Sequence, residues 1–313
     1  MAKPNKIQKT SKLKHVKNII RVIIFGSSGF IGSNLFHHLS KKGGFEVVGY
    51  SVDNCNLLEH EQVVKAMQIA DPETSVVFCS AISRLTEDSW DTMQKNILMV
   101  HNFIASMPKQ GIRSIVFLSS ADVYGFPSSQ VLPITEATLP EPTGYYGLSK
   151  LICEKMLQFK INPSCPVTVL RLAGVFGRSD NFQSMIGKFA KKIAEQQPLI
   201  ITNDGITKRD YIEIDELCQI ITCFLQKPAE GVFNVVTGKS HAVKEIVMML
   251  AKELDVKPKI QFTQQAGERD TNLVFDMTKL KTKLKSACPG IKLKGIEAGI
   301  KKYVQDNALK LKK

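Results

Sequence analysis

The stretch TGYYGLSK, residues 143–150, contains a tyrosine and a lysine at a spacing that suits acid–base chemistry. Tyr146 stands four residues before Lys150, so on a helix both side chains lie on one face, one turn apart. A free tyrosine ionises near pH ~10, and bringing that value down to neutrality requires roughly 4 kcal/mol. One cation about 4 Å away supplies that amount at an effective dielectric of about 20. Tyr145 projects about 100° away and cannot share the lysine. The pair alone is equally compatible with an aromatic stretch that only packs at the start of a helix.

A glycine-rich loop lies closer to the N-terminus. The segment GSSGFIG places Gly26, Gly29 and Gly32 between the apolar run 19–26 and a helical pattern over 33–44. In a dinucleotide-binding loop the first glycine allows a tight turn, the second admits the pyrophosphate, and the third lets helix pack on strand. The helix N-terminus adds amide donors and positive partial charge. The loop therefore predicts a dinucleotide site, with a purely structural turn as the alternative.

Short apolar runs alternate with helical spacings as far as residue 177. This alternation predicts a parallel sheet with right-handed crossovers. The expected fold class is α/β, a doubly wound parallel (Rossmann) sheet with a smaller C-terminal α/β substrate-binding lobe. The expected strands are residues 19–26, 45–51, 55–59, 75–82, 114–120 and 167–177. The expected domains are a basic flexible tail at 1–18, a dinucleotide-binding Rossmann domain at 19–177, and a mainly substrate-binding lobe at 178–313, some segments of which return to the Rossmann domain.

Composition limits the class of protein. The formal charge of +13 could suggest nucleic acid as a partner, but six lysines and no acid lie in residues 1–18, and such tails are usually solvated. Nucleic acid is therefore not expected, and phosphate-bearing ligands explain part of the excess charge. Seven cysteines occur without a CxxC pair or metal-ligand spacing, which indicates a reducing compartment and no metal. No secretory signal or membrane-spanning run is visible, so a cytoplasmic location is expected.

Five segments in this order resemble the extended short-chain dehydrogenase/reductase family, the NAD-dependent epimerase/dehydratase type that acts on nucleotide sugars. They are GSSGFIG, LSSADVYG, YYGLSK, LRLAGVFG and KRDYIEIDEL, spread over nearly the whole chain after the tail. The resemblance implies a catalytic group of Ser120, Tyr146 and Lys150. Ser119 is the second candidate for the serine, pointing to the other strand face.

The resemblance also implies a nicotinamide dinucleotide as cofactor. Lys150 would hold the nicotinamide ribose beside Tyr146. Asp53 follows the second strand and could hold the adenosine ribose, which favours NAD over NADP, although it could equally form a turn. Asn96 matches a helix asparagine near the active site and could instead only bridge helix to strand. The other residues implied in cofactor binding are Gly26, Ser28, Gly29, Phe30, Ile31, Gly32, Asn56, Leu57 and Ala81.

Substrate residues are less well defined. Family dehydratases carry an acidic pair or a glutamate after the catalytic serine or threonine, and this chain has Ala121 and Asp122, which disfavours dehydration. Asp122 could alternatively cap a turn. Arg209 and Arg269 are candidates to bind the substrate phosphate, or are surface ion-pair partners. Two positions depart from the family pattern: Gly174 stands where asparagine is common, and Gln265 where an arginine clamps the pyrophosphate.

The leading hypothesis is therefore an NAD(P)-dependent 4-epimerase or 4-keto-sugar reductase of a nucleotide sugar, acting by hydride transfer at C4. A second hypothesis keeps the fold but takes an alcohol or ketone without a diphosphate. A third is a non-catalytic nucleotide-binding scaffold. A homodimer formed through the helices at 90–107 and 148–159 is implied by the resemblance, and those helices could as well pack only on their own sheet.

Overall fold

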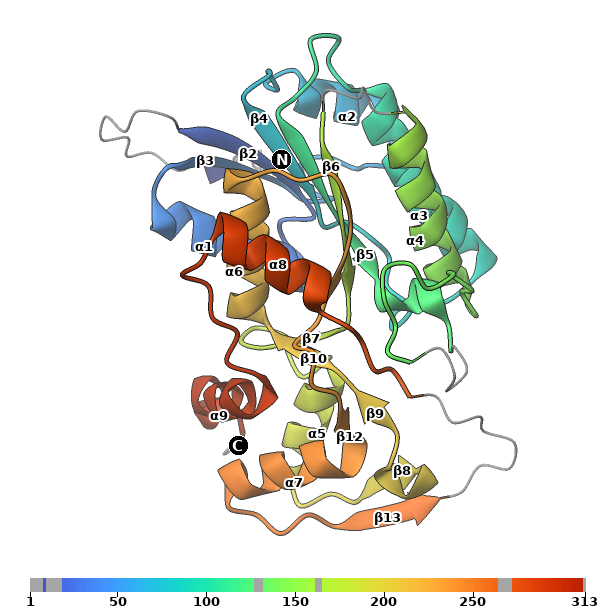
Figure 1. Cartoon of the computed structure of the whole chain (residues 1–313), viewed down its shortest axis with the longest axis vertical. Coiled ribbons are helices and arrows are strands. Elements are labelled where there is room, and N and C mark those ends of the chain that lie inside the picture. Colours follow the sequence, from blue (N-terminus) through green and yellow to red (C-terminus); the bar gives the residue numbers. More distant parts are fainter. Residues whose placement is uncertain (1–7, 10–18, 127–131, 161–164, 264–271, 312–313) are drawn as a thin grey trace, which may run out of the picture. The chain divides into compact units, whose positions relative to one another are not determined.

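The computed structural model describes residues 8–9, 19–126, 132–160, 165–263 and 272–311 (Figure 1). The chain divides into two compact units. Unit 1 comprises Met1–Gly125, Pro140–Arg171 and Cys218–Phe233, and unit 2 comprises Phe126–Leu139, Leu172–Leu217 and Asn234–Lys313. Each unit has its own core.

A seven-stranded sheet in the order β1-β3-β2-β4-β5-β6-β11 forms the centre of unit 1. Strands β3, β2, β4 and β5 pair in parallel, and β1 pairs antiparallel with β3. The doubly wound α/β fold expected from the sequence is confirmed. The strands are β1 (Gln8–Lys9), β2 (Ile20–Phe25), β3 (Phe45–Tyr50), β4 (Thr74–Phe78), β5 (Ser114–Ser120), β6 (Val167–Leu172) and β11 (Gly231–Val235).

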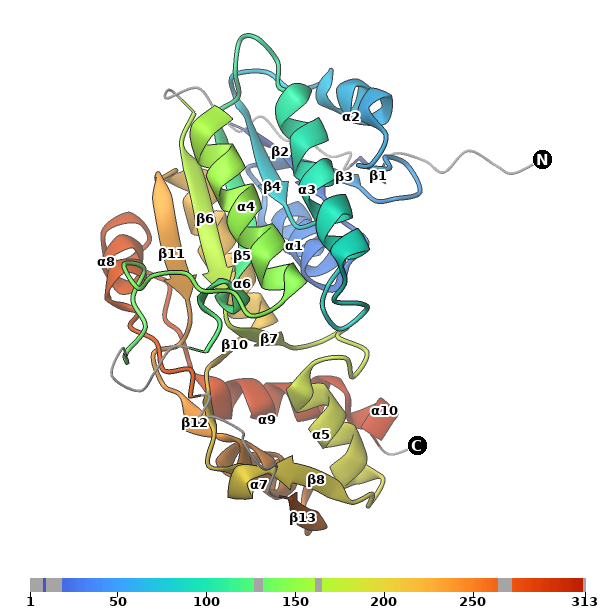
Figure 2. The same ribbon diagram turned by 90° about the vertical axis from the view of Figure 1, so that its right-hand side faces the viewer.

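Helices cover both faces of this sheet. The helices α3 and α4 lie on one face and α1 on the other (Figures 1 and 2). Parallel strands buried on both faces require near-continuous apolar runs, which is why β2, β4 and β5 read as such in the sequence. The helices are α1 (Phe30–Lys42), α2 (His60–Met67), α3 (Trp90–Ala105), α4 (Tyr145–Lys160) and α6 (Ile214–Gln226), with a short 3₁₀ turn η1 (Ala121–Tyr124) after β5.

Aromatic rings fill the core between the sheet and α3. The ring of Phe78 lies 5.9 Å from Phe25, 5.5 Å from Phe103 and 6.0 Å from Phe117. All four side chains are buried, and tilted ring pairs at these separations are favourable beyond the burial of their area. This packing fixes the strands whose carboxyl ends carry the loops of the site.

The prediction of a strand at residues 55–59 is wrong. The structure has turns between Ser51 and α2. The side chain of Asn54 accepts the backbone N–H of Ser51 at 2.7 Å, and that of Asn56 accepts the N–H of Leu58 at 3.1 Å. Asparagine side chains that satisfy local backbone groups favour turns over strand pairing.

The unit boundary falls earlier than the expected residue 177. The chain changes unit after Arg171 because β7 (Gly174–Phe176) pairs with β10 (Tyr211–Glu213) and not with the large sheet. Residues 218–233 return to unit 1, and residues 126–139 belong to unit 2. Of the tail at 1–18, Gln8–Lys9 forms β1, and the other residues of that range lie outside the described part of the chain.

Unit 2 consists of small paired strands packed with helices. Besides β7 and β10, β8 pairs in parallel with β13, and β9 pairs antiparallel with β12. Its buried cluster includes Phe176, Ile201, Leu250 and Tyr303. Its further elements are α5 (Met185–Ala194), β8 (Leu199–Thr202), η3 (Asn203–Gly205), β9 (Lys208–Arg209), β12 (His241–Ala242), α7 (Val243–Leu254), β13 (Ile260–Thr263), α8 (Thr278–Ala287), α9 (Ile296–Asp306) and α10 (Ala308–Leu311).

Within the described ranges no helix is long and apolar enough to cross a membrane. A cytoplasmic location stays a prediction.

A buried ionic network joins α4 to the ends of β5 and β6. Glu154 accepts from Nε and Nη2 of Arg171, at 3.1 and 2.7 Å, and from the hydroxyl of Ser119. The guanidinium carbon of Arg171 lies 4.8 Å from the ring centroid of Tyr124 in η1. The side chains of Glu154 and Arg171 are 1% and 5% exposed, so each ion has little solvent to replace a lost partner. The network holds together the segments that surround Ser120.

We expect Glu154→Gln to destabilise the protein by about 3–5 kcal/mol, because it leaves the buried Arg171 charge uncompensated. Ser119→Ala is the matched control; it removes one hydrogen bond to the same carboxylate and should cost about 1.5–3 kcal/mol, the usual value for a bond to a charged group. Denaturant unfolding followed by circular dichroism measures both values. Equal losses in the two variants would show that the ion pair adds nothing beyond its hydrogen bonds.

Candidate active site

The glycine loop lies between β2 and α1, as the sequence predicts. Gly26 has φ +85°, and a Cβ on it would lie 2.8 Å from Oγ of Ser80. A Cβ on Gly32 would lie 2.1 Å from the carbonyl oxygen of Gly26. Gly29 is the N-cap of α1, and no side chain caps that helix. Its first amides therefore remain for a phosphate, and the glycine spacing is a steric requirement of the turn.

A cavity of about 330 Å³ lies against this loop. Of the residues expected to bind cofactor, it is lined by Gly26, Ser28, Gly29, Asn56, Leu57 and Ala81. Aliphatic lining beside an uncapped helix N-terminus fits an adenosine diphosphate group. The described residues at this site therefore fit a nicotinamide dinucleotide.

Further residues that line the cavity are not evident in the sequence. They are Phe25, Tyr50, Ser51, Val52, Cys55, Leu58, Cys79, Ser80, Ile82 and Met99. Most of these residues could be expected from one rule: ligands of open parallel sheets bind at the carboxyl ends of the strands. Residues 50–52 and 79–82 occupy such ends, after β3 and β4. Met99 carries no comparable signal, because its contribution depends on how α3 packs.

Several residues expected to bind cofactor do not line this cavity. Asp53 is exposed beyond β3, and its role at the ribose stays a prediction. Asn96 is buried in α3, where its side chain accepts the backbone N–H of Ile82 at 2.8 Å and donates to the carbonyl of Ile82 at 3.0 Å. It also donates to the hydroxyl of Ser149 at 3.4 Å. Asn96 thus fixes Ile82, which does line the cavity. Phe30, Ile31 and Gly32 are also absent from its lining.

Tyr146 and Lys150 both lie on α4, as expected from their spacing. The Nζ of Lys150 donates to the carbonyl of Leu118 at 2.8 Å, and lies 5.7 Å from the ring centroid of Tyr146. Tyr145 points elsewhere: it is exposed, and its ring lies 6.5 Å from that of Trp90. The helix therefore brings Tyr146, and not its neighbour, toward the lysine.

The two serines at the end of β5 differ in environment. Ser119 is buried and donates to Glu154. Ser120 is partly exposed, and its hydroxyl accepts the backbone N–H of Asp122 at 3.1 Å. Of the two hydroxyls, that of Ser120 is open to a substrate. The carboxylate of Asp122 pairs with Nε of Arg84 at 2.9 Å.

Burial opposes the charged forms of both members of the tyrosine–lysine pair. It lowers the pKa of Lys150 from its usual value to about 8. It raises the pKa of Tyr146, and the charge of Asp122 raises it further, while Arg84 lowers it. The lysine alone therefore does not produce an acidic tyrosine in this protein without cofactor. Additional positive charge at the site is needed to stabilise the phenolate.

The expected substrate residues lie in different places. Asp122 follows Ser120 in unit 1, Arg209 forms part of β9 in unit 2, and Arg269 lies outside the described residues. Nη1 of Arg209 donates to the carbonyl of Lys208 at 2.9 Å. The neighbouring Asp210 is buried, and accepts the backbone N–H groups of Thr237 and Gly238 at 2.9 Å each. In KRDY the aspartate is thus a structural clamp.

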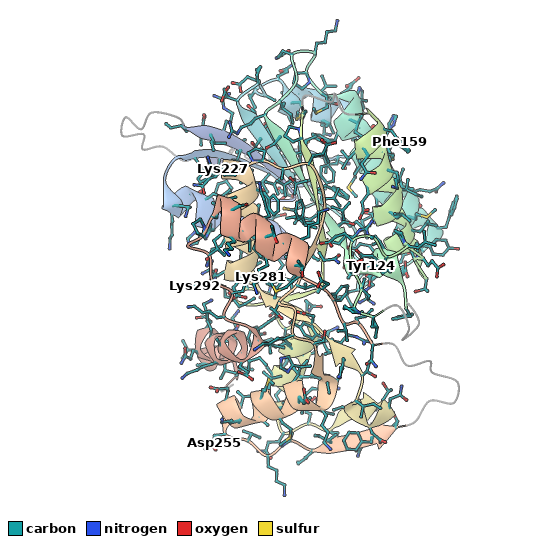
Figure 3. All side chains as sticks on the ribbon, in the orientation of Figure 1. Tyr124, Phe159, Lys227, Asp255, Lys281 and Lys292 are labelled. Carbon is teal, nitrogen blue, oxygen red and sulfur yellow. The ribbon has the colours of Figure 1, made fainter. Side chains whose placement is uncertain are left out.

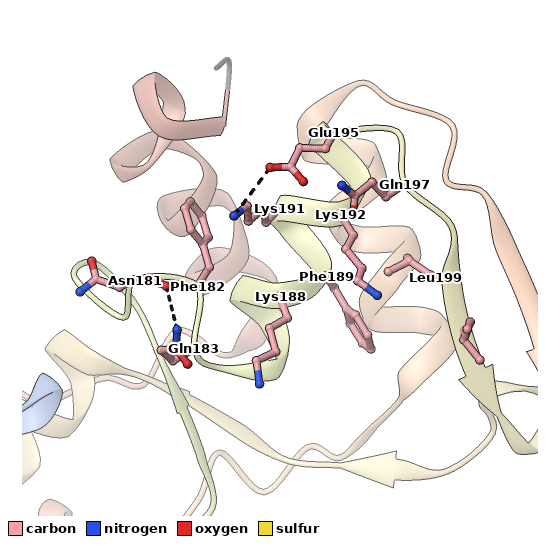
Figure 4. A pocket seen from close by; sticks show the side chains of 11 residues that line it. Asn181, Phe182, Gln183, Lys188, Phe189, Lys191, Lys192, Glu195, Gln197 and Leu199 are labelled. Carbon is pink, nitrogen blue, oxygen red and sulfur yellow. Dashed lines mark hydrogen bonds and ion pairs between the residues drawn. The ribbon is translucent and has the colours of Figure 1, made fainter. Parts of the chain in front are cut away.

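A second cavity, of about 480 Å³, lies on unit 2 between α5 and β8. Lys188 and Lys192 line it together with Phe189 (Figure 4). Lys191 lies 5.9 Å from the ring centroid of Phe182 and 3.8 Å from Oε1 of Glu195. These residues carry no signal in the sequence, because lysines on a helix face are usually solvated.

Known proteins resemble this chain along most of its length. A curated relative, GDP-6-deoxy-D-talose 4-dehydrogenase from Aggregatibacter actinomycetemcomitans, is 25% identical over 237 residues, covering 74% of this chain and 80% of the relative. The solved UDP-glucose 4-epimerase with UDP-glucose from Thermotoga maritima has a TM-score of 0.81 at 22% identity, over 93% of this chain and all of its own. The structure of RMD from Pseudomonas aeruginosa complexed with NADPH has a TM-score of 0.79 at 24% identity, over 92% of this chain and 98% of its own. At these identities the two structures establish the fold.

A sequence model of the NAD dependent epimerase/dehydratase family matches residues 22–236. The match includes the glycine loop, the end of β5, the first turn of α4 and KRDY. It confirms the resemblance inferred from the five segments, and with it the nicotinamide cofactor. The chain therefore belongs to the NAD dependent epimerase/dehydratase family, and is an NAD(P)-dependent enzyme of the extended short-chain dehydrogenase/reductase type.

Proposed function

We propose that the protein catalyses hydride transfer at C4 of a nucleotide-activated sugar, as a 4-epimerase or a 4-keto-sugar reductase. The observation that carries this proposal is the arrangement of α4 against β5. Tyr146 and Lys150 lie on one helix, Lys150 donates to Leu118 at the end of β5, and Ser120 follows two residues later. The relative named as a 4-dehydrogenase and the fold neighbour named as a 4-epimerase support C4 as the reacting carbon.

Each residue of this group has a role in the oxidation. Ser120 hydrogen-bonds the sugar hydroxyl, and Tyr146 takes its proton as the carbon–oxygen bond becomes a carbonyl. When bound, the cofactor accepts the hydride that leaves the carbon, or returns one to the carbonyl. Lys150 stabilises the phenolate and holds the ribose. In the reducing direction Tyr146 gives the proton back to the oxygen.

Dehydration is not favoured by the contacts of Asp122. Its carboxylate is held by Arg84 at 2.9 Å, and the preceding residue is Ala121. This ion pair occupies the carboxylate that would have to take a carbon-bound proton. The site therefore suits the hydride and proton exchange shared by epimerases and reductases.

Purification, denaturation and chromatography of the released cofactor provide the first test. Stoichiometric NAD indicates an epimerase that recycles its cofactor, to be assayed on UDP-, GDP- and dTDP-sugars. Empty protein indicates a reductase, to be assayed with NADH and NADPH on 4-keto sugars. Turnover of only simple alcohols or ketones would contradict the nucleotide-sugar substrate.

In whichever assay shows turnover, we expect Tyr146→Phe to lower kcat by about 10²–10⁴-fold, the usual contribution of a general acid–base. Cofactor affinity should change little. Tyr145→Phe is the matched control and should keep nearly full activity, since that ring is exposed beside Trp90. Equal activity of the two variants would exclude Tyr146 as the acid–base. Cofactor binding with no turnover of any substrate would favour the scaffold hypothesis.

We propose that the cavity beside α5 in unit 2 binds a nucleoside diphosphate group. Three of its lining residues are lysines and one is a glutamate, and the rings of Phe182 and Phe189 also line it. Lysine binds phosphate as a point charge, and an aromatic face can stack on a nucleobase. Lysines beside aromatic rings suit a ligand that carries phosphates and a base, and a simple alcohol carries neither.

We expect the double variant Lys188→Gln/Lys192→Gln to raise the Kd for a nucleoside diphosphate such as UDP or GDP roughly tenfold, about 1.4 kcal/mol of binding. The change in kcat and in cofactor affinity should be much smaller. Lys252→Gln, an exposed charge deletion on α7, is the control. An unchanged Kd in the double variant would contradict nucleotide binding by this cavity.

We further propose a homodimer formed through α3 and α4. Trp90, Leu98 and Phe159 on these helices are exposed, Phe159 by 79% (Figure 3). Exposed large apolar side chains on adjacent helices favour burial against a second copy. Sedimentation at micromolar concentration should show a dimer that Leu98→Lys/Phe159→Glu converts to a monomer. Leu309→Glu, which removes an exposed apolar side chain from unit 2, should leave it dimeric, and a monomeric wild-type protein would contradict the proposal.

A further inference from the structure

The segment between β4 and α3 brings an arginine to the start of α4. Residues 83–86 form a turn, with the N–H of Thr86 bonded to the carbonyl of Ser83 at 2.9 Å. The turn is anchored on both sides. Before it, Ile82 is held by Asn96; after it, Asp88 accepts the backbone N–H of Tyr146 at 2.7 Å. Arg84 is therefore carried by a segment that is bonded directly to the catalytic helix.

Asp122 approaches the same helix end from the other side. It lies in η1, which packs against α4. A Cβ on Gly147, the residue after Tyr146, would lie 2.5 Å from the carbonyl oxygen of Asp122. The amide of Asp122 donates to the hydroxyl of Ser120, and its carboxylate pairs with Arg84. The Arg84–Asp122 ion pair is thus fixed beside both Ser120 and Tyr146.

We propose that Arg84 is a second cation of the catalytic site, a positioning residue that neutralises Asp122 and stabilises the phenolate of Tyr146. This proposal rests on Tyr146 being the acid–base of the proposed function. It assigns a role to a residue outside the serine–tyrosine–lysine group.

Charge balance at Tyr146 explains why a second cation is needed. The Nζ of Lys150 lies 5.7 Å from the ring centroid of Tyr146, and Asp88 accepts the backbone N–H of that residue. The charge of Asp122 raises the pKa of Tyr146, and the charge of its partner Arg84 lowers it. Burial lowers the pKa of Lys150 to about 8, so without a bound ribose this lysine holds its charge less firmly than a free lysine in the alkaline range where a tyrosine ionises. A guanidinium stays protonated throughout that range. Removing Arg84 would leave Asp122 to oppose the phenolate.

The signs follow from these charges. Arg84→Gln raises the pKa of Tyr146, Asp122→Asn lowers it, and the double variant lies near the wild type because both charges are gone. The side chain of Arg84 is 59% exposed, so its field is partly screened, and a shift of about 0.5–1 pH unit is expected for each single variant. Arg84→Lys keeps the charge and should retain most of the wild-type value.

The experiment titrates Tyr146 directly, so it needs no substrate. The full chain is labelled with ¹³C at Cζ of its six tyrosines and loaded with NAD⁺. The Tyr146 signal is identified by its loss in Tyr146→Phe. Its phenolate fraction is followed upward from about pH 10, the free tyrosine value, because burial raises the pKa of Tyr146. We expect the phenolate fraction of Tyr146 to be highest in Asp122→Asn, intermediate in the wild type and lowest in Arg84→Gln. High salt should reduce the differences between the three proteins. Lys95→Gln, which breaks an exposed ion pair with Asp91 on α3, should leave the fraction unchanged.

An unchanged fraction in Arg84→Gln would overturn the proposal, as would an Asp122→Asn variant that ionises no more than wild type. Thermal unfolding of each variant checks that the fold is retained. Where turnover is available, the alkaline shift of the kcat/KM profile in Arg84→Gln should match the shift in the tyrosine titration. A protein that ionises Tyr146 as expected but turns over no nucleotide sugar would contradict the proposed function and leave the role of Arg84 standing.

Discussion

The contact between α4 and the end of β5 is the constraint on which the site depends. Tyr146, Lys150 and Glu154 follow one another at intervals of four residues, so they lie along one face of the helix. Lys150 donates to the carbonyl of Leu118, and Glu154 accepts from Ser119. A lysine carries three donors, so a bound ribose that accepts from the others would favour its charged form. Cofactor binding and protonation of Lys150 are therefore coupled: each favours the other.

The features of this arrangement that depend on local spacing can be predicted from the sequence. The glycine loop and the tyrosine–lysine pair were predicted because a turn and a helix face are set within a few residues. Arg84, Glu154 and Arg171 were not singled out, since their roles arise from segments that are distant in the chain and meet only in the fold. The strand expected at 55–59 failed for a local reason of another kind, the asparagine side chains that satisfy their own backbone.

The glycine loop predicts a dinucleotide site, but the choice between NAD and NADP depends on residues outside that loop. The sequence favoured NAD because Asp53 follows the second strand. In the structure Ser51 and Val52 line the cavity, and Asp53 is exposed. No acidic side chain appears in the lining of that cavity among the described residues. A carboxylate there would repel the 2′-phosphate of NADP, so the described cavity contains no such barrier.

Of the two departures from the family pattern, Gln265 lies outside the described residues, and Gly174 has a physical explanation that weakens it as an argument against a nucleotide sugar. A Cβ on Gly174 would lie 2.3 Å from ring atoms of Tyr211. Glycine is therefore required at that position by the packing of β7 on β10, whatever the substrate. An asparagine lost there removes one polar contact, whereas Lys188 and Lys192 supply positive charge along α5. Charge for a diphosphate can be provided by residues of any element that lines the pocket, because point charges impose little geometry. Gly174 is therefore compatible with the proposed nucleotide-sugar substrate.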